Sequence, residues 1–418
     1  MEESRTYLPQ DLLVHIFLRL EIKSLLRIRC VCKSWYRIIC SSPFIKATIS
    51  SKANEQKDVY TLYTHLDSYS LVRRKGFKTD KKYYYHAELF GINVRKHNSG
   101  IQVYGSCNGL LCVSDLNLRR DSIIYLLNPV IRRAKIIPEI PVEVFDPQGV
   151  ANMCLGYIDD DYKLIKLVGC SGNYRVGVYS LRTNSWKIIS CDRDGVTFGR
   201  LSDSPSSMCV NGVAYFVRYV GAIICFDLHD ERFREVKFPE NFYPIRGQIT
   251  QSFTIEACGE TIALMEISDD GHLVKWVLKN GVLTNTFTWE KVSSIGLQAA
   301  ADNIFPIGFT YDGKYVVKND ALRVLRDGPS SDKYYLCDLG KSELKECMMP
   351  KDLEAIHYLV GNLVLLNEQT LDPFVELEAT CSTRTTFVLC KRRPLTKKEK
   401  EEISRKRQNK DKKEIRRD

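Results

Sequence analysis

The chain has 418 residues, of which 44% are hydrophobic and 27% charged, and its formal net charge is +10. At roughly 150 residues per domain, this length predicts two or three domains, and the composition excludes a disordered or collagen-like chain. The charge-free stretch around the apolar peak at 219–226 is far shorter than the roughly 20 residues of a membrane span, so no membrane partner is expected. The acidic start, without a following apolar segment, does not indicate a secretory signal.

The positive charge is concentrated at the C-terminal end of the chain. Residues 391–418 contain 14 Lys/Arg and 6 Asp/Glu, a net charge of +8, which leaves +2 for the rest. With few apolar residues, this tail is expected to be a solvated helix or disordered. Its basic clusters are typical of nuclear-localisation signals, and the alternative is a tail that only raises solubility. The cluster residues are Lys391, Arg392, Arg393, Lys397, Lys398, Arg405, Lys406 and Arg407. Nucleic-acid binding is not favoured and stays an alternative confined to this tail.

The distribution of Cys, His and Asp does not predict a metal, cofactor or catalytic site. The 15 Cys are scattered without a Cys-x-x-Cys pair, and the 7 His are far apart. Most of these thiols are expected to behave as small buried hydrophobic groups. The acidic runs at 159–161 and 269–270 are expected at hairpin tips, where turn chemistry favours Asp.

The stretch from Tyr7 to Phe44 predicts three short helices. Pro9 suits the first turn of a helix, and apolar residues then recur every four positions at Leu12, Ile16 and Leu20. A second helix is expected to begin near Ser24, and a third to run from about residue 33 and stop before residue 43. The unit has more Leu and Ile than its small size can bury. We therefore expect a partner to cover part of this surface; the alternative is a cap packed on the rest of the chain.

The same stretch closely resembles an F-box motif of plant type. The segments that carry the resemblance are Leu8-Pro9-x-Asp11-Leu12-Leu13, Ile16-Phe17-x-Arg19-Leu20, Lys23-Ser24-Leu25-Leu26-Arg27, Arg29-Cys30-Val31-Cys32-Lys33-Ser34-Trp35 and Ser42-Pro43-Phe44. One departure is Glu21, which stands where the family usually has Pro.

The resemblance implies docking on the Skp adaptor of a cullin-RING ubiquitin ligase. Carried onto this chain, it implies that Leu8, Pro9, Leu12, Ile16 and Leu20 contact the adaptor. Four further residues are expected to be divided between contact and internal core, and these are Leu25, Val31, Cys32 and Trp35.

After Lys46 the helical pattern ends and short strand-like runs with tight turns begin. Six hairpin-like segments align on Asn108, Asp160, Asn211, Gly259, Asp312 and Gly361, at intervals of 52, 51, 48, 53 and 49 residues. Four strands per unit at this period predict a Kelch-like β-propeller, although the double-glycine signature of Kelch repeats is absent. The alternative is an irregular β-sandwich. The expected fold class is therefore α+β multidomain: a three-helix unit over 1–47, an all-β domain over 48–390 and a charged tail over 391–418.

The β region resembles the F-box-associated domain of plant F-box proteins, a family that includes defence regulators and pollen S-locus F-box proteins. Two pairs of stretches carry this resemblance: Gly105–Leu110 with Leu127–Pro129, and Val176–Leu181 with Asn184–Trp186. It implies a non-catalytic substrate-recognition subunit of an SCF-type ligase, with Skp, cullin and RING partners and an unidentified protein substrate. Its expected location is the cytoplasm, the nucleus or both. An F-box scaffold outside the ligase and a propeller enzyme remain the alternatives.

Overall fold

A computed structural model describes the helices and most of the strands of the chain. The described residues are 8–55, 59–65, 68–75, 78–79, 83–86, 101–115, 123–131, 133–141, 150–170, 173–190, 196, 207–218, 221–240, 242, 253–268, 270–279, 287–297, 304–310, 313–319, 333–347, 349 and 353–366. The tail predicted over 391–418, with all eight candidate nuclear-localisation residues, lies outside them. So does the end of the predicted β domain after residue 366.

Four helices open the described part of the chain, where the sequence predicted three. They are α1 (Gln10–Leu18), α2 (Ile22–Ile28), α3 (Lys33–Ile39) and α4 (Ser42–Glu55). The predicted end of helical structure near residue 46 is wrong, because α4 continues to Glu55. The predicted end of the third helix before residue 43 is confirmed, because α3 ends at Ile39. Pro43 also lies in the first turn of the additional helix α4, where its missing N–H has no intrahelical partner.

Five sheets follow, each built from four antiparallel strands that are consecutive along the chain. Their strands are β5 (Ile101–Cys107), β6 (Leu110–Asp115), β7 (Tyr125–Asn128), β8 (Arg133–Ile136); β9 (Val150–Ile158), β10 (Asp161–Cys170), β11 (Asn173–Ser180), β12 (Ser185–Ser190); β13 (Ser207–Val210), β14 (Val213–Val217), β15 (Ala222–Asp227), β16 (Arg232–Lys237); β17 (Phe253–Cys258), β18 (Thr261–Ile267), β19 (His272–Lys279), β20 (Thr288–Gly296); and β21 (Ile304–Phe309), β22 (Tyr315–Asn319), β23 (Lys333–Asp338), β24 (Glu343–Cys347).

The sixth sheet joins the two ends of the β region. It contains β1 (Val59–His65), β2 (Ser68–Lys75), β3 (Lys78–Thr79), β4 (Tyr83–His86) and β25 (Leu353–Val360). β25 pairs antiparallel with β1, with Val59 opposite Val360 and Leu62 opposite His357. The last described strand therefore completes the sheet that the first strands began.

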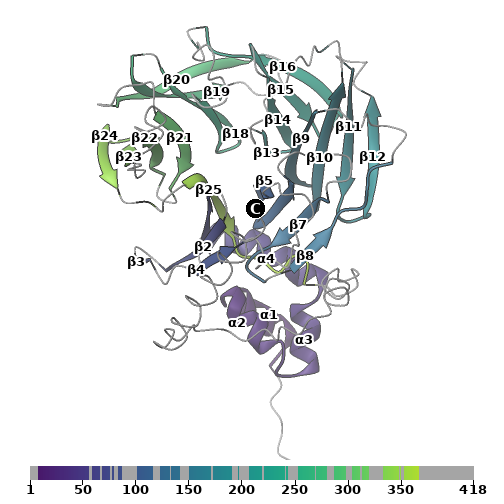
Figure 1. The fold of residues 1–418 in the computed structure, drawn as a ribbon. Coiled ribbons are helices and arrows are strands. Elements are labelled where there is room, and N and C mark those ends of the chain that lie inside the picture. The colour runs from purple at the N-terminus through teal and green to yellow at the C-terminus, as the bar shows by residue number, and fades with distance from the viewer. Residues whose placement is uncertain are drawn as a thin grey trace, which may run out of the picture. The chain divides into compact units, whose positions relative to one another are not determined.

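The six sheets form a propeller, so the sandwich alternative is wrong (Figure 1). The innermost strands contact one another in cyclic order, from β5 through β9, β13, β17 and β21 to β25 and back to β5. A sandwich would instead pack two sheets face to face. Closing the ring leaves each sheet with one exposed outer edge strand and covers both of its faces with neighbouring sheets.

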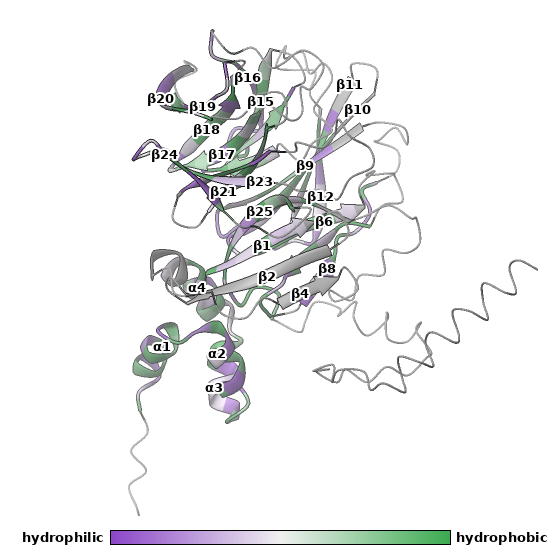
Figure 2. Ribbon diagram, turned by 60° about the vertical axis from the view of Figure 1, so that its left-hand side comes forward, coloured by the Kyte–Doolittle hydropathy of each residue, from purple (hydrophilic) through white to green (hydrophobic). Residues whose placement is uncertain are grey.

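Burial follows this arrangement within each sheet. The middle strands β15 and β18 are almost wholly buried, whereas the outer strands β20 and β24 are mostly exposed. Figure 2 shows the same contrast as green middle strands and purple outer strands. Strands buried on both faces need continuous apolar runs, which is why Ala222–Phe226 shows no polar alternation.

Tight two-residue turns join the two inner strands in the first four of these sheets, as the repeat spacing predicted, and the fifth marker, Asp312, lies outside the described residues. Asn108 and Gly109 connect β5 to β6 with φ values of 42° and 83°, and Asn211 and Gly212 connect β13 to β14 with 47° and 76°. These left-handed conformations are the ones a two-residue hairpin requires. The sixth predicted hairpin, at Gly361, is wrong: that residue follows β25, whose strand partner β1 lies at the other end of the β region.

Buried asparagines hold the segment after β25 against the sheet formed by β5–β8. The Asn128 amide nitrogen donates hydrogen bonds to the Asn362 side-chain oxygen at 2.7 Å and to the Val364 carbonyl oxygen at 2.9 Å. The Asn128 side-chain oxygen accepts a hydrogen bond from the Val130 N–H at 3.2 Å. Asn362 in turn donates to the Asn108 carbonyl oxygen. Both asparagines are almost fully buried, so each bond is formed out of contact with water.

Replacing Asn128 is expected to weaken the closure of the ring. Asn128→Ala leaves the buried oxygens of Asn362 and Val364 without this donor, which costs about 1–3 kcal/mol for each buried polar group left unsatisfied. We expect the midpoint of urea unfolding to fall clearly. Asn128→Asp keeps a side-chain oxygen acceptor but lacks the amide donor. It should therefore destabilise the protein as well, which assigns the effect to the lost donor. Wild-type midpoints in both variants would contradict the prediction.

Candidate docking surface

Helix α1 presents an apolar stripe to solvent. Leu12 and Ile16 are 51% and 48% exposed, and their four-residue spacing places them on one side of the helix. Leu8, which precedes the helix, is 57% exposed. Pro9, at the N-cap position, is exposed as well. The opposite side of α1 is anchored by Phe17, which is 2% exposed and forms edge-to-face ring contacts with Trp35 and Phe44. The helix is therefore fixed from inside while its outer stripe stays uncovered.

A second exposed apolar group lies at the junction of α2 and α3. Val31 is 64% exposed, and Cys32 beside it is exposed too. Cys32 caps α3, because its sulfur accepts a hydrogen bond from the Trp35 N–H at 3.5 Å. Tyr36, which the sequence reasoning did not single out, is 41% exposed on α3. Its position one residue after the half-buried Trp35 was the only available signal.

The remaining predicted contact residues lie inside or partly inside the helical unit. Leu25 is 0% exposed and belongs to its core, together with Ile22 and Ile39. Leu20 and Trp35 are half-buried and pack against the same core. Of the nine predicted residues, six are therefore exposed, two are half-buried and Leu25 is internal.

The core of the helices continues into the propeller through α4. Ile45 and Ile49 of α4 belong to one buried cluster with Phe17 and Leu25 on the helical side and Leu359 of β25. Lys46 adds an ion pair to Asp160, at 3.2 Å, at the tip of the β9–β10 hairpin. Both side chains of this pair are substantially exposed, so it contributes little stability, and the apolar contacts are the main connection.

The acidic run at 159–161 forms a hairpin tip, as expected. Asp159 and Asp160 have φ values of 50° and 58°, the left-handed conformation that Asp tolerates in turns. Asp161 is buried and accepts hydrogen bonds from the Ser180 hydroxyl at 2.5 Å and the Arg182 N–H at 2.8 Å. Through these hydrogen bonds the carboxylate stabilises the β11–β12 turn. Asp269 of the second run lies outside the described residues.

The propeller cysteines whose side chains the structure describes are free thiols. Cys112, Cys154, Cys225 and Cys337 are buried, and Cys209 is partly exposed. Burial raises the pKa of the Cys112 thiol to about 12 and that of Cys337 to about 12, which keeps both uncharged at neutral pH. Among the described residues, no group of three or more His, Cys, Asp or Glu side chains is placed to hold a metal ion. No helix in the described part of the chain is long and apolar enough to cross a membrane.

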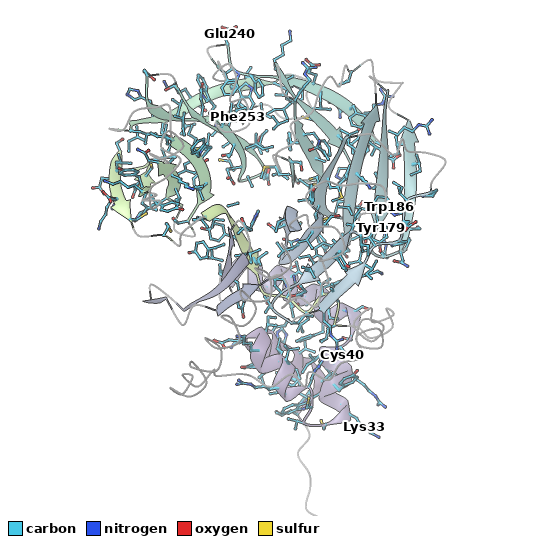
Figure 3. All side chains as sticks on the ribbon, viewed as in Figure 1. Lys33, Cys40, Tyr179, Trp186, Glu240 and Phe253 are labelled. Atoms are coloured by element: carbon cyan, nitrogen blue, oxygen red, sulfur yellow. The ribbon has the colours of Figure 1, made fainter. Side chains whose placement is uncertain are left out.

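The second pair of motif stretches forms one packed corner of the propeller. Tyr179 of β11 and Trp186 of β12 stack with ring centroids 5.4 Å apart (Figure 3). The Tyr179 hydroxyl donates to the Asn184 side-chain oxygen at 2.7 Å, and the Trp186 indole N–H donates to the Pro138 carbonyl oxygen at 2.7 Å. Gly177 leaves room for the Trp186 ring, since a Cβ there would come within 3.1 Å of it. These residues stabilise the sheet.

Two titratable groups on the innermost strands have strongly shifted pKa values. Burial raises the pKa of Glu256 on β17 to about 7 and lowers the pKa of His357 on β25 to about 4. Both shifts favour the uncharged form, because the surrounding protein replaces water around the side chain. The interior of the ring is therefore less charged at neutral pH than its sequence suggests.

Glu256 is expected to make the stability of the fold depend on pH. Its pKa rises from 4.5 to about 7 on folding, so stability falls as pH increases through this range and is constant above it. Glu256→Gln should remove this loss, and its stability advantage over wild type should be larger at about pH 8 than at about pH 5. Urea unfolding at both pH values checks this, with the exposed Glu260→Gln as control. An advantage that does not change with pH would contradict the prediction.

An exposed helical docking unit followed by a closed six-sheet propeller defines an F-box protein of the propeller class. Residues 6–47 match the F-box domain, and residues 58–354 match the F-box associated beta propeller domain. The chain belongs to this family of plant F-box proteins.

Relatives from Arabidopsis thaliana match over most of their length. The chain is 26% identical to the F-box/kelch-repeat protein At3g23880, over 83% of this chain and 96% of the relative. It is 24% identical to the F-box protein CPR1, over 86% and 89%. Among solved structures, the SapL1 lectin in complex with alpha methyl fucoside aligns with a TM-score of 0.40 and 9% identity, over 70% of this chain and 96% of that chain.

Proposed function

We propose that this protein is the substrate-recognition subunit of an SCF-type ubiquitin ligase. The observation that carries the proposal is the uncovered apolar surface of the F-box helices, formed by Leu8, Leu12, Ile16 and Val31. Exposed apolar side chains at helical spacing, next to a well-packed core, are typical of a site that a partner helix covers. The Skp adaptor is the partner that the F-box match supports.

The contact surface proposed for the adaptor contains the exposed members of the predicted set. Leu12 and Ile16 belong to it from α1, Leu8 and Pro9 from the segment just before α1, and Val31 and Cys32 from the α2–α3 junction. Leu20 and Trp35 contribute their exposed parts, and Leu25 supports the surface from the core beneath it.

Truncating the α1 stripe is expected to weaken adaptor binding. Central apolar anchors are worth about 2 kcal/mol each, so Leu12→Ala with Ile16→Ala should weaken binding by a plant Skp adaptor roughly 100-fold or more. Titration calorimetry on the purified full chain measures this. Val292→Ala is the matched control, because Val292 is 52% exposed on the outer strand β20 of the propeller. The control should bind like wild type, and unchanged binding by the double variant would disprove the docking surface.

The mechanism proposed for the ligase is proximity. The F-box holds the chain on the adaptor, and the propeller holds a target so that its lysines reach the ubiquitin carried by the RING-bound enzyme. This raises the effective concentration of the reacting groups and requires no catalytic residue in this chain. The shared core of α4 and β25 supports the proposal, because a stiff connection preserves the geometry between the two binding sites.

The end of the ring away from α4 is the proposed substrate side. The inner hairpin turns, including Asn108–Gly109 and Asp159–Asp160, lie at the end that Lys46 of α4 contacts. In an antiparallel four-stranded sheet, the connections to the next sheet leave from the opposite end. Those connections span 137–149, 191–206 and 238–252, which are far longer than the turns. Loops of this kind carry specificity in propellers.

The target is identified by comparing wild type with the docking variant. The Leu12→Ala, Ile16→Ala protein keeps its propeller but does not enter the ligase, so its targets should co-purify with it and accumulate in cells. Proteins that accumulate equally with wild type are not targets. Adaptor binding without ubiquitination of any co-purified protein would indicate an F-box scaffold instead.

Deleting residues 391–418 tests the proposed nuclear-localisation role of the basic tail. The deletion removes a net charge of +8, including all three basic clusters, and we expect it to reduce the nuclear fraction of a fluorescent fusion. Adaptor binding should not change. A second variant, in which Gln replaces Lys397, Lys398 and Arg405–Arg407 in the full-length chain, should reduce the nuclear fraction in the same way. An unchanged distribution would show that the tail is only solubilising.

A further inference from the structure

The F-box helices carry an excess of positive charge that the rest of the folded chain does not share. Between residues 8 and 46 there are seven Lys/Arg and two Asp/Glu, a net charge of +5 over 39 residues. Outside the tail the whole chain has a net charge of only +2, so the remainder of the body is slightly acidic. The basic character of the folded part is thus confined to the unit that bears the exposed apolar surface.

Three of these basic side chains are exposed on α2 and α3. Arg27 lies at the end of α2, and Lys33 and Arg37 lie on α3. Lys33 is two residues from the exposed Val31, and Arg37 follows the exposed Tyr36. The Lys33 side chain extends outward from α3 (Figure 3). Within the described part of the chain, no acidic side chain forms an ion pair with any of the three.

The positions of the basic residues on α3 would be electrostatically unfavourable in an isolated helix. Lys33 occupies the first turn, where the helix dipole disfavours a cation, and this turn contains no acidic residue. Lys33 and Arg37 are also four residues apart, so two like charges face each other on adjacent turns, which is destabilising. The helix dipole favours Arg37, which lies in the last turn, so the unfavourable position is that of Lys33. Such local conflicts are expected where a surface is built for a partner.

We propose that Arg27, Lys33 and Arg37 form a basic rim of the docking surface, and that the adaptor presents a complementary acidic surface to it. This inference rests on the proposed docking function and adds the charge of the partner and the role of the rim. The apolar residues hold the complex together, because their burial is lost only on dissociation. The rim accelerates its formation, because exposed charges at the edge of an interface act mainly by steering the encounter.

The test measures association and dissociation rates between the full chain and a purified plant Skp adaptor over a range of salt concentrations. The test protein carries Arg27→Gln, Lys33→Gln and Arg37→Gln together. We expect its association rate at low salt to fall roughly tenfold, its salt dependence to flatten, and its dissociation rate to change by less than about threefold. All three side chains are exposed, and an unchanged circular dichroism melt shows that the variant folds.

A charge-matched control separates the rim from net charge. Lys237→Gln, Lys341→Gln and Lys345→Gln remove the same charge from exposed positions on the propeller sheets. This control should retain the wild-type association rate and salt dependence. The docking variant Leu12→Ala, Ile16→Ala should show the opposite pattern to the rim variant, with a faster dissociation rate and a nearly unchanged association rate.

Three outcomes overturn the inference without affecting the proposed function. These are tight adaptor binding with a salt-independent association rate, equal slowing by the rim and control variants, and a rim variant with wild-type rates. If the rim variant also loses binding to a fluorescent single-stranded RNA that wild type binds, while its adaptor rates are unchanged, the basic surface serves nucleic acid instead. Failure of wild type to bind any Skp adaptor would contradict the proposed function itself.

Discussion

The antiparallel pairing of β1 with β25 is the constraint on which the propeller depends. Each sheet is too small to bury both of its faces alone, so all six require neighbours on both sides, and only a closed ring supplies them. Closure joins strands almost 300 residues apart, from Val59 to Val360, and its backbone hydrogen bonds must offset the entropy of closing that loop. The Asn128–Asn362 contacts strengthen the same junction. Gly109 is required there too, because a Cβ would lie 2.0 Å from the Val360 carbonyl oxygen.

The same junction connects the ring to the helical unit. Helix α4 is the element before β1 in the chain, and its buried residues share a core with β25 and with the inner side of α1. The docking stripe and the closing sheet are thus two sides of one packed cluster. This arrangement explains why the helices can leave Leu12 and Ile16 uncovered: the short helices are held by Phe17, Leu25 and Ile39 beneath them.

The net charge differs between three parts of the chain. The tail contributes +8, the F-box helices +5 between residues 8 and 46, and the rest of the body is slightly acidic. Inside the ring, burial keeps the Cys112 thiol and His357 uncharged at neutral pH and raises the pKa of Glu256 to about 7, which reduces its charge there. Ionised groups are therefore disfavoured where the sheets pack, as the cost of desolvating them requires.

The sequence by itself determined the features that depend on local patterns. The four-residue spacing of Leu12, Ile16 and Leu20 predicted an apolar helix face, and the first two of these residues are exposed in the structure. Turn pairs such as Asn108–Gly109 and Asn211–Gly212 predicted the repeating sheets. Both signals are local, because helical periodicity and positive-φ turns depend on neighbouring residues. Only the tertiary structure decided what depends on distant residues. It showed that β25 closes the ring on β1, that Leu25 belongs to the core while Tyr36 is exposed, and that α4 continues to Glu55 against the propeller. Burial and strand pairing across hundreds of residues are properties of packing, and no local pattern records which distant surface a side chain will meet.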